Sequence, residues 1–197
     1  MIWEGLSPPY RTIVADPPWH YDGFAGGVGR GGYFAGSAEQ VQVKVKPLPY
    51  SSLSVEAIAA LPVGELADRD SWLALWTTNR YLGAAFNVLA AWGFAYRQTL
   101  VWRKTGNPIP FGGTIAPNHC EFLLLAAKGS PGVVARQSSN VIEAQKPNVH
   151  SLKPSAALDL IEWSCPGPYV ELFARAPRLG WDSWGYGYES APQRTTR

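Results

Sequence analysis

The sequence has few cysteines and no long uninterrupted apolar run. Cys120 and Cys165 lie far apart in apolar surroundings, so neither a disulfide framework nor a metal-ligand spacing is visible. His119 beside Cys120 is more typical of a packed pair than of half a zinc site. No stretch reaches the ~18 apolar residues of a membrane-spanning helix, and no signal peptide is recognisable. We therefore expect no metal site, no membrane contact and a reducing, cytoplasmic location.

Charge is also sparse, at 16% of residues, with a formal net charge of +2 and a pI near 8.5. Such a mildly basic balance does not by itself indicate nucleic acid, for which a pI above ~9 is more telling. Basic residues recur in expected loops, where a solvated surface is the alternative interpretation: Arg30, Lys44, Lys46, Arg103 and Lys104. Hydrophobic residues make up 46% and aromatic residues 13% of the 197 residues, which fits one globular domain with a sizeable core.

Strand and helix patterns alternate along the chain. Apolar runs predict strands at 11–15, 71–78, 94–104, 120–129 and 169–175, and helical spacing predicts helices after Ser54, at 80–92 and after Pro154. The alternation favours an α/β sheet with helices on its faces, as one domain over 1–190 with a disordered tail at 191–197. Ligands of such sheets bind beyond the carboxyl ends of the strands, so Asp16 and Arg175 are expected in one crevice.

Glycine is concentrated in residues 23–36, which contain the spacing Gly27-x-Gly29-x-x-Gly32. That spacing superficially matches a dinucleotide-binding fingerprint, but the fingerprint requires a strand directly before it and a helix directly after it. Neither neighbour is present, so the stretch is interpreted as a mobile loop.

A distinctive chemical pattern, Asp16-Pro17-Pro18-Trp19, directly follows the first expected strand. Two prolines fix successive φ angles and supply no amide proton, which leaves carbonyls that no local donor is expected to reach. A carboxylate, a rigid carbonyl and an aromatic plate suit a planar exocyclic amine. The amine hydrogens would go to Asp16 and to the Pro17 carbonyl, and the ring would stack on Trp19. A proline-rich turn beside a buried tryptophan is the structural alternative.

The order of further blocks resembles the DPPW-type N6-adenine methyltransferases, the family of the messenger-RNA adenosine methyltransferase subunits and their bacterial and phage relatives. The resemblance covers residues 13 to 184 in collinear order. Its blocks are "VADPPW", "LPYSSLSVEAIAALPV", "LALWTTNRYLGAAFNVLAAWGF", "LVWRKTG", "CEFLLLAAKGSP", "HSLKP" and "VELFARAPRLGWDSWG". The family implies a Rossmann-like S-adenosylmethionine-dependent fold: a mostly parallel sheet with helices on both faces, and the catalytic motif N-terminal to the main cofactor strand.

The resemblance also implies roles for individual residues. Asp16, Pro17, Pro18 and Trp19 match the catalytic motif, with Asp16 also beside the methyl donor. Tyr50, Glu121 and Lys153 match positions on the acceptor side, and Lys153 also matches a position near the cofactor carboxylate. Glu171 and Arg175 match the cofactor strand, with the arginine near the ribose. No metal ligand is implied.

Each of these positions has a simpler structural alternative. Lys153 could be a solvated residue ahead of a helix, and Glu121 a charge at a strand edge. Tyr50 could be a loop aromatic that packs on the rim. Glu171 could pair with Arg175 if one strand continues through both residues.

Three departures from the family concern the adenosine end of the cofactor. Pro177-Arg178 stands near the place of a His-Asn pair, and Gly185-Tyr186-Gly187 near that of a Gly-Asn-Gln or Gly-Asn-Glu. The chain before Asp16 is short, which leaves Trp3, Glu4 or nothing for the upstream contacts to the adenine ring.

The resulting expectation is methyl transfer from S-adenosylmethionine to the N6 amine of adenine in nucleic acid, with DNA preferred over RNA because zinc-finger and accessory domains are lacking. The 23–36 loop and the segment 103–113 are candidate substrate arms. The resemblance implies a homodimer or a heterodimer. The alternatives are methylation of another exocyclic amine such as cytosine N4, and a catalytically silent nucleic-acid-binding partner subunit. Asp16 and Trp19 together favour adenine.

Overall fold

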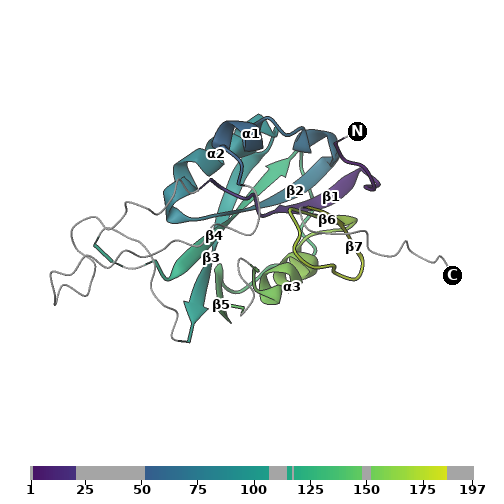
Figure 1. Ribbon diagram of the computed structural model, residues 1–197. Helices are drawn as coiled ribbons and strands as arrows, with labels where there is room; N and C mark the ends of the chain where they lie inside the picture. The colour runs from purple at the N-terminus through teal and green to yellow at the C-terminus, as the bar shows by residue number, and fades with distance from the viewer. Residues whose placement is uncertain (1, 21–51, 107–114, 117, 148–151, 186–197) are drawn as a thin grey trace.

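The chain is described by a computed structural model over residues 2–20, 52–106, 115–116, 118–147 and 152–185 (Figure 1). Tyr50, the glycine-rich stretch 23–36 and residues 186–197 lie outside this part, and so do the expectations that concern them. None of the helices in the described part is long and apolar enough to span a membrane.

Within the described residues, the strands form one sheet in the order β5-β3-β4-β2-β1-β6-β7. Strand β1 pairs in parallel with β2 and β6, β3 with β5, and β6 with β7, whereas β4 runs antiparallel to both β2 and β3. The strands are β1 (Tyr10–Ala15), β2 (Ala67–Thr77), β3 (Ala95–Thr105), β4 (Cys120–Lys128), β5 (Val141–Gln145), β6 (Tyr169–Leu172) and β7 (Trp181–Trp184). The expected mostly parallel α/β fold is confirmed.

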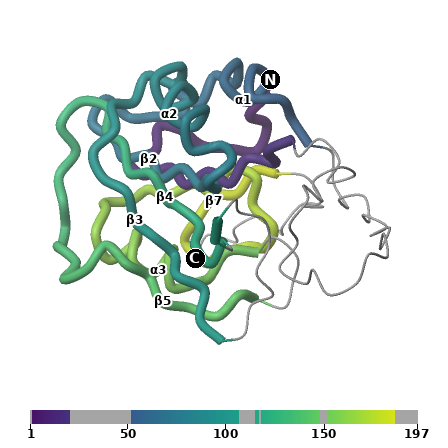
Figure 2. Tube along the Cα trace, turned by 90° about the vertical axis from the view of Figure 1, so that its left-hand side faces the viewer, coloured from purple at the N-terminus to yellow at the C-terminus, as the bar shows by residue number. Residues whose placement is uncertain are grey.

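Helices cover both faces of this sheet. Helices α1 (Val55–Ala59) and α2 (Leu82–Ala91) lie on one face and α3 (Ser155–Ser164) on the other (Figures 1 and 2). Short 3-10 helices occupy Val63–Glu65 and Asn79–Tyr81. A hydrophobic core lies on each face of the sheet, and alternate residues of β1 point into one or the other. Ile13 packs toward α1 and α2, and Val14 packs with α3 residues.

Local sequence signals explain most of the boundaries. The Ser54 hydroxyl accepts a hydrogen bond from the backbone N–H of Ala57 and caps α1 as expected. Gly93 follows α2 with φ 82°, a left-handed conformation that glycine adopts without strain. Helix α2 begins at Leu82 rather than at the expected residue 80, because residues 79–81 form a 3-10 turn.

Two expectations near the C-terminus are also corrected. Strand β6 ends at Leu172 rather than at Arg175, because Phe173 has φ 63° and turns the chain out of the sheet. The sequence patterns predicted no strand after residue 175, but residues 181–184 form the edge strand β7. Gly185 follows it so closely against this turn that an added Cβ would lie 2.7 Å from the Ala174 nitrogen.

Candidate active site

The site is built around Asp16, the residue directly after β1. The apolar run of β1 is buried between β2 and β6, so the first charged residue after it emerges at the carboxyl edge of the sheet. The Asp16 backbone N–H donates to the Leu172 carbonyl at 3.3 Å, which ties this position to β6. The residue is only 8% exposed. Asp16 is therefore a nearly buried acid at the edge where such sheets bind ligands.

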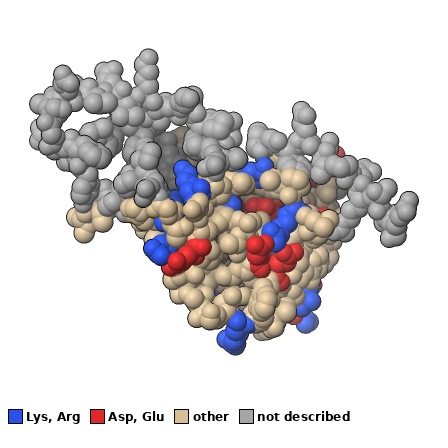
Figure 3. Space-filling view, turned by 90° about the horizontal axis from the view of Figure 1, so that it is seen from below, with Lys and Arg blue, Asp and Glu red and all other residues tan. Residues whose placement is uncertain are grey.

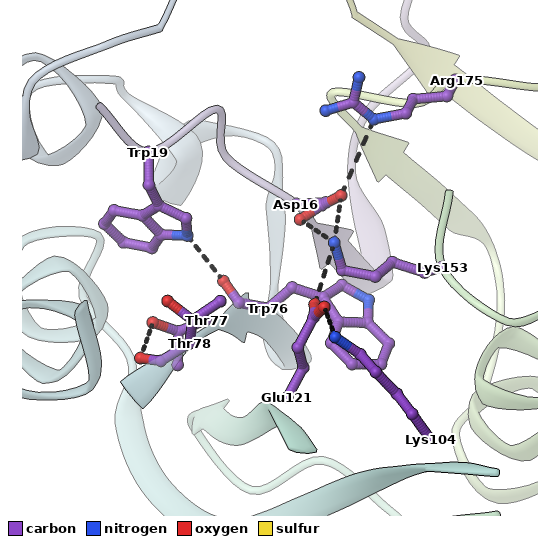
Figure 4. A network of polar contacts seen from close by, with 9 residues as sticks. All are labelled: Asp16, Trp19, Trp76, Thr77, Thr78, Lys104, Glu121, Lys153 and Arg175. Carbon is purple, nitrogen blue, oxygen red and sulfur yellow. Dashed lines mark hydrogen bonds and ion pairs between the residues drawn. The ribbon is translucent and has the colours of Figure 1, made fainter. Parts of the chain in front are cut away.

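Lys153, in the segment just before α3, supplies the cation that faces Asp16 (Figure 4). Its Nζ lies 2.8 Å from Oδ1 and 2.8 Å from Oδ2 of Asp16, and the side chains are 14% and 11% exposed. The interpretation of Lys153 as a solvated residue is therefore wrong. In the described structure, both oxygens of Asp16 are engaged by this one ammonium group.

Glu121, on β4, continues the charge pattern beyond Lys153. Its Oε2 lies 3.4 Å from the Lys153 Nζ, and its Oε1 lies 2.7 Å from the Nζ of Lys104 on β3. Arg103 and Lys104 both belong to β3, as the expected strand over 94–104 places them, and not to a loop. Trp102 is paired with Glu121 across the two strands, so strand alternation places Lys104 two residues on, on the same face as Glu121. The alternation of side chains along the strand was therefore the sequence signal that could have placed Lys104 on the face of the site.

Two tryptophans lie against the lysines. The Lys153 Nζ is 5.5 Å from the ring centroid of Trp76, and the Lys104 Nζ is 5.1 Å from that of Trp102. The two indoles meet edge to face at 6.1 Å and are each 1% exposed. The charges therefore rest on an apolar aromatic floor, where cation–π attraction favours the ammonium groups and water is excluded from one side.

Burial and the neighbouring charges compete in setting the protonation of the site. Burial raises the pKa of the Asp16 carboxyl, and the Lys153 ammonium opposes that rise. Burial also acts against ionisation of Glu121, but Lys153 and Lys104 outweigh it and hold its pKa below the ordinary value. The pKa of Lys153 is raised because Asp16 and Glu121 outweigh its own desolvation. Lys153 is therefore held in its charged form.

The carbonyls of Pro17 and Pro18 both have hydrogen-bond partners in the described structure. The Pro17 carbonyl accepts a hydrogen bond from the Trp19 N–H at 2.8 Å, and the Pro18 carbonyl accepts one from the Leu53 N–H at 2.8 Å. The expectation that no local donor reaches these carbonyls is therefore wrong. A carbonyl has two lone pairs, so the Pro17 oxygen keeps capacity for a second donor.

Trp19 is a core residue in this structure rather than an exposed plate. It is 4% exposed, stacks on Tyr81 at 5.2 Å, and donates its indole N–H to the Trp76 carbonyl at 3.1 Å. These contacts bind the residues after Asp16 to β2 and to the turn before α2. Trp19 thereby fixes the direction in which the chain leaves Asp16.

Arg175 and Glu171 flank Asp16 on the other side. The Arg175 Nε lies 4.0 Å from Oδ2 of Asp16, so the two side chains lie close together, as expected. Glu171 and Arg175 form no ion pair in the described structure, because the turn at Phe173 takes Arg175 out of the strand. Strand pairing sets Glu171 beside Val14, on the same face as Asp16. Burial, with the Asp16 charge as the next cause, raises the pKa of Glu171 to about 7.

Two of the departures from the family have structural uses here. Arg178 donates to Asp159 and Glu162 of α3, and it lies 5.8 Å from the ring centroid of Trp181. Trp3 packs edge to face on Trp184 at 4.8 Å. Both residues therefore serve packing around β7. Within the described residues, no cluster of three or more histidine, cysteine, aspartate or glutamate side chains is arranged to hold a metal ion.

Comparison with known proteins gives a match over nearly the whole chain. The sequence model of the MT-A70 family matches residues 10–187. The type II methyltransferase M.MunI of Mycoplasma sp is 29% identical over 189 residues, which cover 89% of this chain and 76% of that protein.

Other relatives are longer than this chain. The N(6)-adenine-specific methyltransferase METTL4 of Mus musculus is 28% identical over 193 residues, with 89% of this chain and 37% of that protein covered. The N(6)-adenosine-methyltransferase subunit METTL3 of Danio rerio is 27% identical, with 84% of this chain and 25% of that protein covered. The chain thus spans most of M.MunI but much less than half of the two animal proteins.

Proposed function

The chain belongs to the MT-A70 family, and we propose that it uses Asp16 to present the N6 amine of adenine to the methyl group of S-adenosylmethionine. Adenine-N6 methylation of nucleic acid is the activity that the family and its named relatives indicate. The proposal concerns the cofactor, the residues that bring it together with the amine, and the nucleic acid that carries the adenine.

The observation that carries the proposal is the nearly buried carboxylate of Asp16 at the carboxyl edge, with Lys153 at 2.8 Å. An ionised carboxylate accepts hydrogen bonds from an exocyclic amine and leaves the nitrogen lone pair directed away from the acceptors. The Lys153 ammonium favours this ionised form by opposing the rise in the pKa of Asp16 that burial causes. Lys153 contacts each Asp16 oxygen once, and each oxygen has a second lone pair that can accept an amine hydrogen.

The polar groups around Asp16 fit S-adenosylmethionine. Lys153 would hold its carboxylate, and Glu171 with Arg175 would face the ribose hydroxyls, which need both an acceptor and a donor. When bound, the cofactor supplies a methyl group on a positively charged sulfur. In the transfer, a nitrogen–carbon bond forms, the carbon–sulfur bond breaks with its electron pair on sulfur, and the amine loses one proton to solvent.

Asp16 contributes by position and charge. Hydrogen bonds to Oδ1 or Oδ2 fix the orientation of the amine and stabilise the positive charge that develops on its nitrogen. The rigid Pro17-Pro18 pair and the Trp19 contacts hold the Asp16 backbone during this step. Tyr50 and Glu121 remain predicted contacts on the acceptor side.

DNA is the proposed nucleic acid. The resemblance to a type II methyltransferase, a class that modifies DNA, supports this choice. An adenine in a duplex must be flipped out, at a cost of a few kcal/mol, before its amine can reach Asp16. On the α3 side, basic and acidic side chains lie next to one another in the described surface, without a broad basic area (Figure 3). Phosphate contacts are therefore expected elsewhere, and a second protomer, as a homodimer or a heterodimer, is a proposed source.

The test is transfer of tritiated methyl from S-adenosylmethionine to single- and double-stranded DNA and RNA oligonucleotides, followed by mass spectrometry of the nucleosides. Asp16→Asn removes the charge at constant size and is expected to lower kcat by about 100-fold or more. Asp159→Asn, at an aspartate whose side chain is 60% exposed, is the matched control and should act like the wild type.

The outcomes separate the alternatives. N6-methyldeoxyadenosine formed by the wild type and by Asp159→Asn supports the proposal, and the corresponding ribonucleoside would move the substrate to RNA. Methylated cytosine would indicate the other exocyclic amine. No product together with no thermal shift on adding S-adenosylmethionine would favour the silent partner subunit, because a ligand at 100 times its dissociation constant adds ~2.7 kcal/mol of stability.

A further inference from the structure

Four charged side chains of alternating sign cross the carboxyl edge of the sheet in one continuous row (Figure 4). The row begins at Lys104 and continues through Glu121 and Lys153 to Asp16. The successive closest distances are 2.7 Å, 3.4 Å and 2.8 Å. The described side chains of the row are between 11% and 17% exposed, so water screens these charges only partly.

Glu121 is shared by the two lysines, and this sharing controls where Lys153 lies. The Glu121 carboxylate is closer to Lys104, at 2.7 Å, than to Lys153, at 3.4 Å. Lys153 is closer to Asp16, at 2.8 Å, than to Glu121. Without the Lys104 charge, Lys153 would be the only cation of the row beside Glu121, and Coulomb attraction would draw it away from Asp16.

We propose that Lys104 is a positioning residue for methyl transfer. By neutralising the charge of Glu121, it allows Lys153 to remain paired with Asp16. The proposal rests on the function proposed above. Lys104 acts through two other side chains and need not touch adenine or the cofactor.

The structure holds Lys104 firmly enough for this role. Its backbone N–H donates to the His119 carbonyl at 3.0 Å within the pairing of β3 with β4. Its Nζ lies over the Trp102 ring at 5.1 Å, and the Trp102 indole N–H donates to the Ala144 carbonyl at 3.0 Å. The lysine stem therefore lies on a tryptophan that is itself fixed between β3 and β5.

Titration of Asp16 in the free protein tests this chain of contacts without any substrate. The charged groups that act on Asp16 are Lys153, Glu121 and Arg175, with Glu171 beside them. The protein is labelled with ¹³C at the aspartate carboxyl groups, and the Asp16 signal is assigned by its loss in Asp16→Asn. Lys104→Met removes the charge but keeps an apolar stem over Trp102.

Removing either end of the Lys104–Glu121 pair should move the Asp16 titration in opposite directions. Lys104→Met should raise the midpoint by about half a pH unit or more, because a cation is lost and Lys153 shifts toward Glu121. Glu121→Gln should lower the midpoint, because a neighbouring anion is lost and Lys153 then pairs with Asp16 alone. In the active enzyme, the acid limb of kcat against pH should move in the same two directions.

The controls keep the proposal separate from general damage. Lys104→Arg retains the charge and should restore the wild-type midpoint. Arg103→Met removes the neighbouring cation, whose side chain is 53% exposed, and should leave the midpoint unchanged. An unmoved midpoint in Lys104→Met, or equal movement in Arg103→Met, would overturn the inference. Absence of methyl transfer by the wild type would instead overturn the proposed function, and the titration would still decide the role of Lys104.

Discussion

Arg103 and Lys104 are consecutive residues of β3, yet their ion pairs lie in two different regions of the molecule. Arg103 pairs with Glu143 at 2.7 Å on an open surface, where the side chains are 53% and 55% exposed. Lys104 pairs with Glu121 at the same 2.7 Å distance, but these side chains are 16% and 17% exposed. Arg103 and Lys104 point to opposite faces of the sheet, because the side chains of successive strand residues alternate between the two faces.

The comparison shows that distance does not decide what an ion pair does. On the open surface, water and salt screen the charges, and forming the pair changes little. Over the aromatic floor, each charge has lost much of its hydration and depends on its neighbours for compensation. A change at one member of the buried row must therefore alter the protonation of the others, whereas a change at Arg103 stays local.

Lys153→Met should break the buried row most severely, because it leaves Asp16 and Glu121 without the cation that they share. We expect the free energy of unfolding at pH 8 to fall by about 3 kcal/mol. Without Lys153, the pKa of Asp16 in the folded protein rises further above its unfolded value. The folded state then binds a proton more readily, so the deficit should shrink as the pH falls through that folded pKa.

Urea unfolding at several pH values measures this deficit. Lys146→Met, at an exposed lysine, is the matched control and should unfold like the wild type at every pH. A deficit that is equal at pH 5 and pH 8 would indicate lost packing of the lysine stem rather than uncompensated charge.

Glu171→Gln tests the acidic end of the same face. The pKa of Glu171 is raised to about 7 in the folded protein, from an ordinary value of 4.5, mainly by burial. As the pH rises from 4.5 to 7, the unfolded chain ionises while the folded one holds its proton, so the wild type loses stability over that window. The variant should therefore be more stable than the wild type by up to about 3 kcal/mol above pH 7, and no more stable at pH 4.

The measurement is again unfolding against pH, with Glu65→Gln at an exposed glutamate as the control. A pH-independent difference between Glu171→Gln and the wild type would contradict the assignment. The same variant should weaken cofactor binding if Glu171 faces the ribose, which a thermal shift with S-adenosylmethionine would detect.

Much of this arrangement could be predicted from the sequence, and the limits are physical. The apolar runs and the Asp16 motif located the strands and the acid, because burial requires such patterns. The expected strand over 94–104 included Lys104, but its contact with Glu121 could not be predicted, because that contact depends on the pairing of β3 with β4, which is not local. The end of β6 depends on the left-handed conformation of Phe173, which the residues "LFAR" do not predict. The burial of Trp19 depends in the same way on contacts with β2 and Tyr81.

Arg178→Met probes a region of intermediate exposure and should have an intermediate effect. The Arg178 guanidinium, 21% exposed, donates to Asp159 at 2.6 Å and to Glu162, whose side chains are 60% and 36% exposed. We expect a loss of about 1 kcal/mol, reduced by salt. Hydrogen bonding to Arg178 lowers the pKa of Glu162. That part of the stability is therefore present above the ordinary pKa of a glutamate and should be lost as the pH falls through the lowered value.

Arg103→Met should have the smallest effect, and its size decides whether the comparison of the two regions holds. The Arg103–Glu143 pair is short, at 2.7 Å, but more than half of each side chain is in water. We expect the free energy of unfolding to change by less than about 0.5 kcal/mol, and that small difference to vanish in 1 M NaCl. Lys104→Met, measured alongside at the same salt concentrations, should retain its effect because its partner is shielded from solvent. If both variants lost their effects in salt, the buried row would be screened like the surface, and the exposure of the two pairs would not explain their roles.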